Sequence, residues 1–212
     1  MSPERSPELF DSWAADYDYF IKIGAESFPF LGYHAVLKRI VELADPKPRM
    51  KILDIGIGTG SLAARFIDSG CEIWGVDYSS KMLEEAKKKV PDANLFQVDI
   101  RSEWPSTLKV GFDRIVSAYT LHHLNLEGKT KVIKRMAKEL LLDDGDIIVG
   151  DISFPTFVER AKARKKLEHV WDDDEFYWAA DEFKTIMIGE GFYVGYEQIS
   201  EYGGIYIVVP RK

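Results

Sequence analysis

The sequence predicts an α/β fold in which a mostly parallel sheet of seven strands carries helices on both faces. Short apolar runs alternate with amphipathic helical stretches along most of the chain, which is the pattern of an open α/β sheet. A glycine-rich loop joins the first apolar run to the helical stretch that follows it. Two closely spaced apolar runs near the carboxyl end predict an antiparallel hairpin at the edge of the sheet.

The amino-terminal part predicts two helices and the first strand. Amphipathic periodicity extends over residues 10–20 and again over residues 32–43, which predicts a helix in each segment. Pro46 and Pro48 then interrupt the chain. The apolar run 51–55 predicts the first strand, which leads directly into the glycine loop.

The next part predicts a helix, a strand and a second helix. A helical stretch, 61–69, follows the glycine loop, and the apolar run 72–77 predicts the second strand. Ser79 or Ser80 has the side chain that favours the start of a helix. That helix is expected to run to about Lys89.

The middle of the chain continues the alternation. Apolar runs at 95–98 and 112–118 predict the third and fourth strands, with a polar loop between them. A helix is expected from about 126 to 142. The residues Asp-Asp-Gly at 143–145 predict a turn, and the run 146–152 predicts the fifth strand.

The carboxyl-terminal part has a different character. Residues 156–169 predict a basic amphipathic helix, and residues 180–189 predict another helix. The runs 191–199 and 205–209 predict the last two strands, and the glycine pair at 203–204 separates them. Their proximity implies an antiparallel hairpin.

Length and composition indicate a globular protein. The 212 residues suit one domain, 46% of them are hydrophobic and 30% are charged. The formal net charge of −7 disfavours binding to DNA, to RNA and to acidic membrane surfaces. The single cysteine, Cys71, excludes an internal disulfide. Because no apolar run approaches roughly 20 residues, we expect a soluble cytoplasmic protein with no membrane segment. We expect the protein to be a monomer or a homodimer.

The glycine loop is the strongest functional signal in the sequence. Residues 54–60 read Asp-Ile-Gly-Ile-Gly-Thr-Gly. Glycines let the backbone turn tightly and approach a ligand closely, and the helix that follows presents unpaired N–H groups. The loop can therefore hold the carboxylate and ribose of a nucleoside-like cofactor, or a pyrophosphate. The dinucleotide fingerprint is Gly-x-Gly-x-x-Gly, and Ser61 stands where its third glycine would fall.

Acidic residues stand at the ends of three consecutive predicted strands. Asp77 ends the second strand and can accept hydrogen bonds from both hydroxyls of a ribose. Asp99 follows the third strand and can accept from an exocyclic amine such as that of adenine. Together with Asp54 in the glycine loop, they predict a nucleoside site beyond the carboxyl ends of the strands.

Four segments resemble the class I S-adenosylmethionine-dependent methyltransferases. They are 53–62 (Leu-Asp-Ile-Gly-Ile-Gly-Thr-Gly-Ser-Leu), 75–83 (Gly-Val-Asp-Tyr-Ser-Ser-Lys-Met-Leu), 98–99 (Val-Asp) and 112–124 (Phe-Asp-Arg-Ile-Val-Ser-Ala-Tyr-Thr-Leu-His-His-Leu). The resemblance covers about residues 10–209 and includes the antiparallel final strand, which dinucleotide folds lack. It implies a Rossmann-like fold, S-adenosyl-L-methionine as the methyl donor and S-adenosyl-L-homocysteine as a product.

The resemblance also implies an organisation of the chain and a set of site residues. One methyltransferase domain, 1–212, would comprise an N-terminal helical cap (1–45), a cofactor-binding core (50–153), a substrate-covering insertion (154–180) and a C-terminal helix with its hairpin (181–210). The glycines would line the methionine and ribose part, Tyr78 and Met82 would flank the adenine ring, and Ile100 would cover it. The residues implied to bind the cofactor are Tyr17, Asp54, Gly56, Ile57, Gly58, Gly60, Asp77, Tyr78, Met82, Asp99, Ile100 and Ser117.

The N-terminal segment resembles a motif of many small-molecule methyltransferases. Trp13 and Tyr17 are followed by Asp18 in a Trp-x-x-x-Tyr-Asp pattern, and the resemblance implies that Tyr17 closes over the cofactor. The alternative is a helix face that packs both aromatic rings into the core, and the two interpretations are compatible. Together with the His-His-Leu at 122–124 and the segment 175–178, this motif resembles a group of bacterial methyltransferases of undefined substrate.

Two adjacent histidines are the candidates for catalysis. His122 and His123 follow the fourth strand, near the expected position of the methyl group, and histidine can act as a base near neutral pH. The alternative is a structural hydrogen bond that anchors the loop. A metal site is disfavoured because adjacent histidines point in different directions and the sequence shows no evident third ligand. Tyr119 is a further candidate for the pocket.

The segment after the fifth strand is expected to cover the methyl acceptor. Its aromatic residues could build a wall of the acceptor site. They are Phe154, Phe157, Trp171, Phe176, Tyr177 and Trp178. The alternative for these residues is ordinary core packing.

The leading functional hypothesis is methylation of a small molecule. Methylation of a tRNA base is an alternative that the basic segment 156–169 permits and the net charge disfavours. A nicotinamide-dependent reductase is disfavoured by Ser61 and by the terminal hairpin. The glycine loop is equally compatible with a protein that binds S-adenosylmethionine without catalysis.

Overall fold

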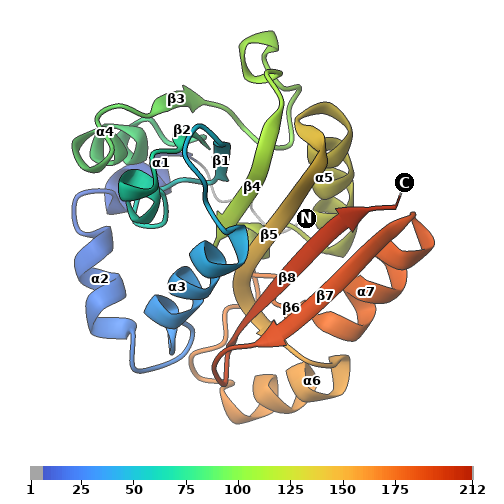
Figure 1. Cartoon of the computed structure of the whole chain (residues 1–212). Coiled ribbons are helices and arrows are strands. Elements are labelled where there is room, and N and C mark those ends of the chain that lie inside the picture. Colours follow the sequence, from blue (N-terminus) through green and yellow to red (C-terminus); the bar gives the residue numbers. More distant parts are fainter. Residues whose placement is uncertain (1–6, 212) are drawn as a thin grey trace.

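The computed structural model describes residues 7–211, and its centre is a mixed β-sheet (Figure 1). The strands lie in the order β3-β2-β1-β4-β5-β8-β7, and β6 pairs with the end of β5 off this path. Strands β1 to β6 pair in parallel, whereas β8 is antiparallel to both β5 and β7. The bounds are β1 Lys51–Ile55, β2 Glu72–Asp77, β3 Asn94–Gln97, β4 Phe112–Ala118, β5 Leu141–Phe154, β6 Trp178–Ala179, β7 Phe192–Gln198 and β8 Gly203–Pro210. The predicted α/β fold, with its antiparallel terminal hairpin, is confirmed; the two-residue strand β6 was not predicted.

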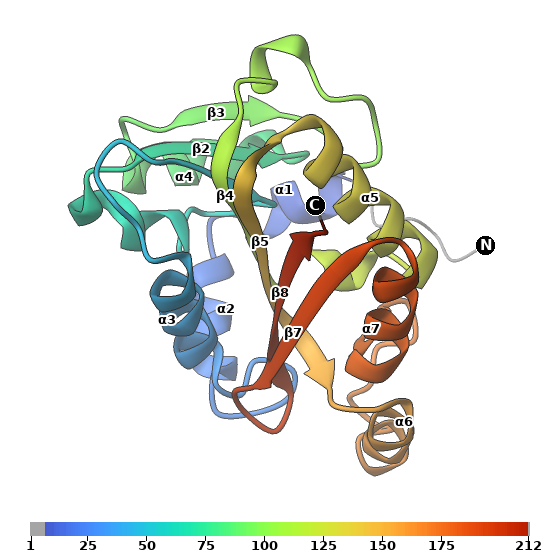
Figure 2. The same cartoon turned by 45° about the vertical axis from the view of Figure 1, so that its right-hand side comes forward.

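Helices cover both faces of the sheet. Figure 2 shows α2 and α3 on one side of it and α5 and α7 on the other. The α-helices are α1 Pro7–Trp13, α2 Tyr17–Gly24, α3 Tyr33–Ala44, α4 Ser80–Lys89, α5 Leu126–Glu139, α6 Phe157–Lys166 and α7 Ala180–Gly189. The 3-10 helices within residues 7–211 are η1 Ala63–Ser69, η2 Ser106–Leu108 and η3 Leu121–His123.

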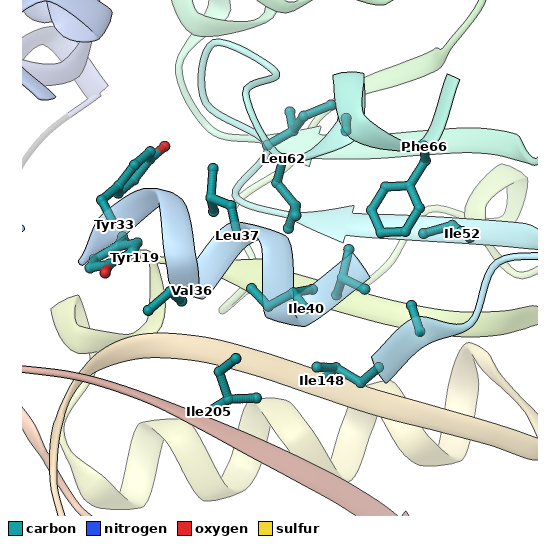
Figure 3. Close-up of a cluster of buried hydrophobic side chains, with 14 of the residues drawn as sticks. Tyr33, Val36, Leu37, Ile40, Ile52, Leu62, Phe66, Tyr119, Ile148 and Ile205 are labelled. Atoms are coloured by element: carbon teal, nitrogen blue, oxygen red, sulfur yellow. The ribbon is translucent and has the colours of Figure 1, made fainter. Parts of the chain in front are cut away.

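Alternate residues of each central strand enter two different hydrophobic clusters. Ile148 of β5 packs with α3 and η1 on one face (Figure 3), whereas Ile147 and Val149 pack with α5 and α7 on the other. In β1, Ile52 belongs to the first of these clusters and Leu53 to the second. Successive side chains of a strand point to opposite faces, so a sheet that is covered on both faces needs the nearly continuous apolar runs seen in the sequence.

Side-chain caps fix the start of three helices. Ser79 accepts a hydrogen bond from the Met82 amide (3.0 Å) and so begins α4. Asn125 accepts from the Gly128 amide (2.8 Å) at the start of α5. Thr156 begins α6 in the same manner. Each cap satisfies a helix amide that has no partner within the helix.

The single helix predicted over 10–20 is wrong, because the structure has two helices there. The chain turns after Trp13, where the Asp16 amide donates to the Trp13 carbonyl (3.1 Å), and the second helix starts at Tyr17. Ala14 is buried in that turn. Both helices carry apolar residues at helical spacing, so periodicity alone does not reveal the break.

Two further segments differ from the prediction, one in its helix type and one in its boundary. The segment after the glycine loop is the 3-10 helix η1, in which the Arg65 amide donates to the Leu62 carbonyl (3.0 Å). The turn predicted at 143–145 lies inside β5, because Leu141 already pairs with Phe112 of β4 across an irregularity in the register. The helix before it therefore ends at Glu139.

Strand order places a crevice at one edge of the sheet. The chain builds β1, β2 and β3 in one direction and then returns to place β4 and β5 on the other side of β1. Ligands of open α/β sheets bind beyond the carboxyl ends of the strands at such a reversal. Within residues 7–211, no helix has both the length and the apolar character that crossing a lipid bilayer requires.

Candidate functional site

A cavity of about 800 Å³ opens beyond the carboxyl ends of β1, β2 and β4. Its volume lies in the range of small-molecule sites, roughly 300–1,000 Å³. Most of the residues expected to bind a cofactor line it. They are Tyr17, Asp54, Gly56, Ile57, Gly58, Asp77, Tyr78, Met82, Asp99 and Ile100, and the further candidate Tyr119 lines it too.

The glycine loop needs its glycines for different reasons. Gly56 has φ +68°, and a Cβ atom there would lie 2.2 Å from Thr120 Cγ2. Gly58 has φ +53° and open space around it, so its backbone faces the cavity freely. A Cβ on Gly60 would meet the α4 backbone at Ala86, 3.2 Å away. Gly60 therefore serves close packing of the loop on α4 and does not line the cavity.

Asp77 connects the end of β2 to the glycine loop. Its Oδ2 accepts from the Gly58 amide (2.9 Å) and its Oδ1 from the Ser79 amide (2.9 Å). A carboxylate has about four acceptor positions, so these two bonds leave Asp77 acceptor capacity for a ligand in the cavity. Burial raises the pKa of Asp77 above its usual value, although the amide hydrogen bonds oppose that shift.

Asp54 is a buried carboxyl at the edge of the cavity. Its side chain is 2% exposed, and its Oδ2 has no hydrogen-bond partner within residues 7–211. Burial, with the nearby charge of Asp77, raises the pKa of Asp54 to about 8. A buried polar atom without a partner carries a free-energy penalty, which a donor group of a bound ligand would remove.

Asp99 holds a charged partner of its own. Arg101 donates to both carboxylate oxygens, with Nη2 2.6 Å from Oδ2 and Nε 2.9 Å from Oδ1. This pairing lowers the pKa of Asp99, while partial burial opposes the shift. Asp99 is thus an ionised acceptor at the cavity that a ligand amine would share with Arg101.

The structure does not place Ser117 at the cavity. Its hydroxyl is buried and donates to the Ile55 carbonyl (2.8 Å), so it links β4 to β1 within the sheet. The cavity is instead lined by the residues that follow Ser117, at the end of β4 and just beyond it: Ala118, Tyr119 and Thr120.

Acidic residues of α1 and α2 tie the N-terminal helices to the cavity rim. Asp18 accepts from the Thr59 hydroxyl (2.7 Å) in the glycine loop and from the Lys89 ammonium of α4. Asp11 accepts from the Ser79 hydroxyl (2.6 Å) at the start of α4. These anchors hold Tyr17 in the cavity wall, where burial raises the pKa of its phenol.

An aromatic side chain of α1, Phe10, lies in the wall of the cavity. The Phe10 ring contacts Tyr78 edge-on (centroids 5.1 Å apart) and His123 (5.3 Å). Phe10 thereby joins the expected adenine end to the end where the two histidines lie.

The two histidines differ in position. His123 lines the cavity, whereas His122 is buried behind it and is 4% exposed. Asp151 on β5 binds His122 at two points, its Nδ1 (2.6 Å) and its amide (3.0 Å). Burial lowers the pKa of His122, but Asp151 and Glu175 outweigh this effect and leave the pKa raised. His122 thus has the loop-anchoring role given above as an alternative to catalysis.

A third candidate side chain, Glu175, lies beside the histidines. Its Oε1 is 3.7 Å from His122 Nε2 and 4.0 Å from His123 Nδ1. The backbone of Phe176 holds this segment in place, because its amide donates to the His122 carbonyl (2.7 Å) and its carbonyl accepts from the buried ammonium of Lys129. Burial lowers the pKa of Lys129 to about 7.

The expected aromatic wall is mostly wrong. Of its six members, only Phe176 lines the cavity. Phe157 is 51% exposed on α6, and Trp171 stacks on Phe28 (5.7 Å) away from the cavity. Phe154, Tyr177 and Trp178 are buried in the hydrophobic clusters.

Acidic neighbours neutralise much of the basic helix α6. Arg160 pairs with Glu182, Arg164 with Asp173 and Lys166 with Glu201. A surface that binds a polyanion needs cations that can exchange their counterions for phosphates, so these pairs give the tRNA hypothesis no support.

Sequence reasoning missed several residues at the cavity. Tyr33 packs against Tyr119 with the rings tilted and their centroids 4.9 Å apart, and both line the wall. Further residues of the wall that were missed are Phe10, Thr59, Thr120, Asn125, Lys131, Arg135 and Asp174. The acids that flank the Trp13–Tyr17 motif, Asp11 and Asp18, were the available signal for a docked N-terminal segment.

Comparisons with known proteins agree on one family. A family model described as a methyltransferase domain matches residues 52–145. An uncharacterized methyltransferase of Oceanobacillus iheyensis is 29% identical over 97% of this chain and 96% of its own length. One of Bacillus cereus (strain ATCC 10987) is 30% identical over 92% of each chain. The crystal structure of magnesium protoporphyrin IX methyltransferase from Synechocystis, with bound S-adenosylhomocysteine, superimposes with a TM-score of 0.68 at 17% identity, covering 97% of this chain and 99% of that one. The chain therefore belongs to a family of bacterial methyltransferases, and it shares the fold of the solved S-adenosylhomocysteine-bound methyltransferase.

Proposed function

We propose that the protein transfers a methyl group from S-adenosylmethionine to a small-molecule acceptor. The observation that carries the proposal is the junction of Asp77 with the glycine loop. Asp77 holds the Gly58 amide and keeps acceptor capacity toward a cavity large enough for a nucleoside. Family membership and the resemblance between the four sequence segments and methyltransferase motifs support the same donor.

The residues of the cavity fit the parts of this donor. Asp77 would accept from the ribose hydroxyls, and Asp99 would accept from the adenine amine. Tyr78, Met82 and Ile100 provide apolar surface for the adenine ring. Asp54 Oδ2, which lacks a partner within the described residues, would accept from the ammonium of the methionine part. An ammonium beside Asp54 would also favour its ionised form.

The acceptor would enter at the end of the cavity where His123, Asp174 and Phe176 lie. The sulfonium of the donor supplies an activated methyl group, so the main task of the protein is to align the acceptor and exclude water. Phe10, whose ring contacts His123, and Tyr17 also line the cavity. Of the two histidines, His123 lines the cavity; it would contact the acceptor and, where the acceptor must lose a proton, assist its removal.

Calorimetric titration of the full chain tests the donor assignment. We expect micromolar affinity for S-adenosylmethionine and for S-adenosylhomocysteine, and no detectable affinity for NADH. Binding of NADH in place of S-adenosylmethionine would refute the proposal. Methyl transfer itself is tested with radiolabelled donor and a fractionated metabolite extract; label recovered in a small molecule supports a small-molecule acceptor, and label recovered only in RNA refutes it.

A further inference from the structure

His122, His123 and Glu175 bring three metal-binding atoms together beside the acceptor end of the cavity. One ring nitrogen of each histidine and a Glu175 oxygen lie within 4.8 Å of one another. Two imidazoles and one carboxylate form a ligand set typical of divalent first-row transition ions. We propose that this cluster of two histidines and a glutamate binds one such ion, Zn²⁺ or a close relative, with an open coordination position directed to the cavity.

The spacing of the three atoms suits an ion after a small adjustment. Bonds of about 2.1 Å to a tetrahedral ion place its ligand atoms roughly 3.4 Å apart. Glu175 Oε1 lies 3.7 Å from His122 Nε2 and 4.0 Å from His123 Nδ1. All three ligand atoms start within 4.8 Å of one another, so rotations of the histidine and glutamate side chains would bring them to the spacing of a bound ion. The ligands come from η3 and from the loop before β6, so the ion would join two segments that are distant in sequence.

Asp151 gives His122 the orientation of a metal ligand. It binds the Nδ1 side of the ring at 2.6 Å, which leaves Nε2 facing Glu175. Asp151 is itself fixed by hydrogen bonds from the Trp178 indole (3.0 Å) and the Ile152 amide (2.8 Å). A carboxylate that orients a histidine from behind is the usual outer partner of a metal-bound imidazole.

The position of the cluster gives the ion a task in the proposed function, on which this part of the inference rests. His123 lines the cavity, and so do Asp174 and Phe176 on either side of Glu175. Three protein ligands leave a fourth position for a water molecule or a substrate. An acceptor with a hydroxyl or thiol group would bind there, and the ion would lower the pKa of that group.

Metal titration of the untagged, chelator-treated full chain tests the proposal. A Cys71→Ser background removes the one thiol. We expect one Zn²⁺ per chain with micromolar or tighter affinity, weakened at least about tenfold by His123→Asn and by Glu175→Gln. His169→Asn and Glu168→Gln are matched controls on the surface and should leave the affinity unchanged. Visible absorption of Co²⁺ in the same site provides a second measurement, and His123→Asn should abolish it.

Zn²⁺ affinity equal in the wild type and in the His123→Asn/Glu175→Gln double variant would overturn the proposal, provided that urea midpoints show both to be folded. The affinity of the metal-free chain for S-adenosylmethionine is measured in parallel. Retained donor binding without a specific Zn²⁺ site refutes this inference and leaves the proposed function standing. Zn²⁺ binding without donor affinity refutes the proposed function instead.

Discussion

At the scale of single residues, Asp77 is the most direct test of the donor site. We predict that Asp77→Ala weakens the affinity for S-adenosylmethionine by one to two orders of magnitude, because hydrogen bonds to two ribose hydroxyls are lost. Asp77 also holds the Gly58 and Ser79 amides, so Asp77→Asn serves as a milder variant. Calorimetry provides the measurement. Asp68→Asn, on the exposed surface of η1, is the matched control, and an Asp77→Ala affinity equal to that control would remove Asp77 from the ribose role.

Asp54 makes a prediction about pH and stability in the absence of ligand. Its pKa is raised to about 8 by burial, against about 4 in an unfolded chain. Below pH 4 the carboxyl is neutral in both states. As the pH rises from 4 to 8, the unfolded state ionises and the native state does not, so the native state loses stability. The loss relative to Asp54→Asn is at most about 1.4 kcal/mol per pH unit and ends above pH 8.

Urea unfolding of wild type and Asp54→Asn at pH 5, 7 and 9 measures this difference. We expect the free energy of unfolding of the variant to rise relative to that of the wild type between pH 5 and 8, and the difference to stay constant above pH 8. Parallel stability profiles of the two proteins would contradict the raised pKa of Asp54.

Residues that share a local motif were predictable, and residues that meet only through the fold were not. Asp54 and Asp77 lie in the last two residues of their strands and Asp99 just beyond its strand, and parallel strands bring their carboxyl ends to one edge. Glu175 lies beside His123 only because β5 and the loop before β6 bring the two segments together. No periodicity or spacing encodes such a contact, and for this reason the sequence showed no third ligand.

At the scale of elements, the anchoring of α2 through Asp18 is open to test. Asp18 joins the Thr59 hydroxyl and the Lys89 ammonium, and its side chain is half exposed. We predict that Asp18→Asn lowers the affinity for S-adenosylmethionine about three- to tenfold, because an exposed pair contributes up to about 1 kcal/mol and its loss loosens Tyr17. Asp16→Asn, just before α2, is the control and should have no effect. Equal affinities of the two variants would show that the anchor does not support the site.

Element types were easier to predict than their ends. Buried strands such as β4 stand out because both faces of the sheet demand apolar side chains. The start of β5 was misjudged because Asp-Asp-Gly resembles a turn, whereas Leu141 already pairs with Phe112 across an irregular register, so these residues belong to the strand. Gly145 fits there because a Cβ would lie 2.7 Å from Leu141 Cδ1. The pairing with the neighbouring strand β4 sets where β5 begins, and the local sequence carries no signal of that pairing.

At the scale of the whole molecule, the cavity joins segments that are far apart in the chain, from Phe10 to Phe176. Its wall includes residues of α1, the glycine loop, the ends of β2 and β4, α5 and the loop before β6. In contrast, β7 is the edge strand of the sheet and α7 packs against it. Within the described residues, neither contributes to the cavity wall. A bound donor should therefore stabilise the first group of segments locally and leave the second group as it was.

Hydrogen exchange with and without S-adenosylmethionine measures this division. For amides that exchange within minutes through local openings, we predict slower exchange in 7–24, 56–61 and 77–82 when the donor is bound, because an opening that breaks the site must also release the ligand. Early-exchanging amides in 180–198 should be unaffected, since their openings leave the site intact. Asp77→Ala at the same donor concentration should lose most of the protection. Equal slowing in 180–198 and at the cavity wall would mean that the donor acts on the fold as a whole, and protection confined to 56–61 would mean that α1 and α2 do not close over it.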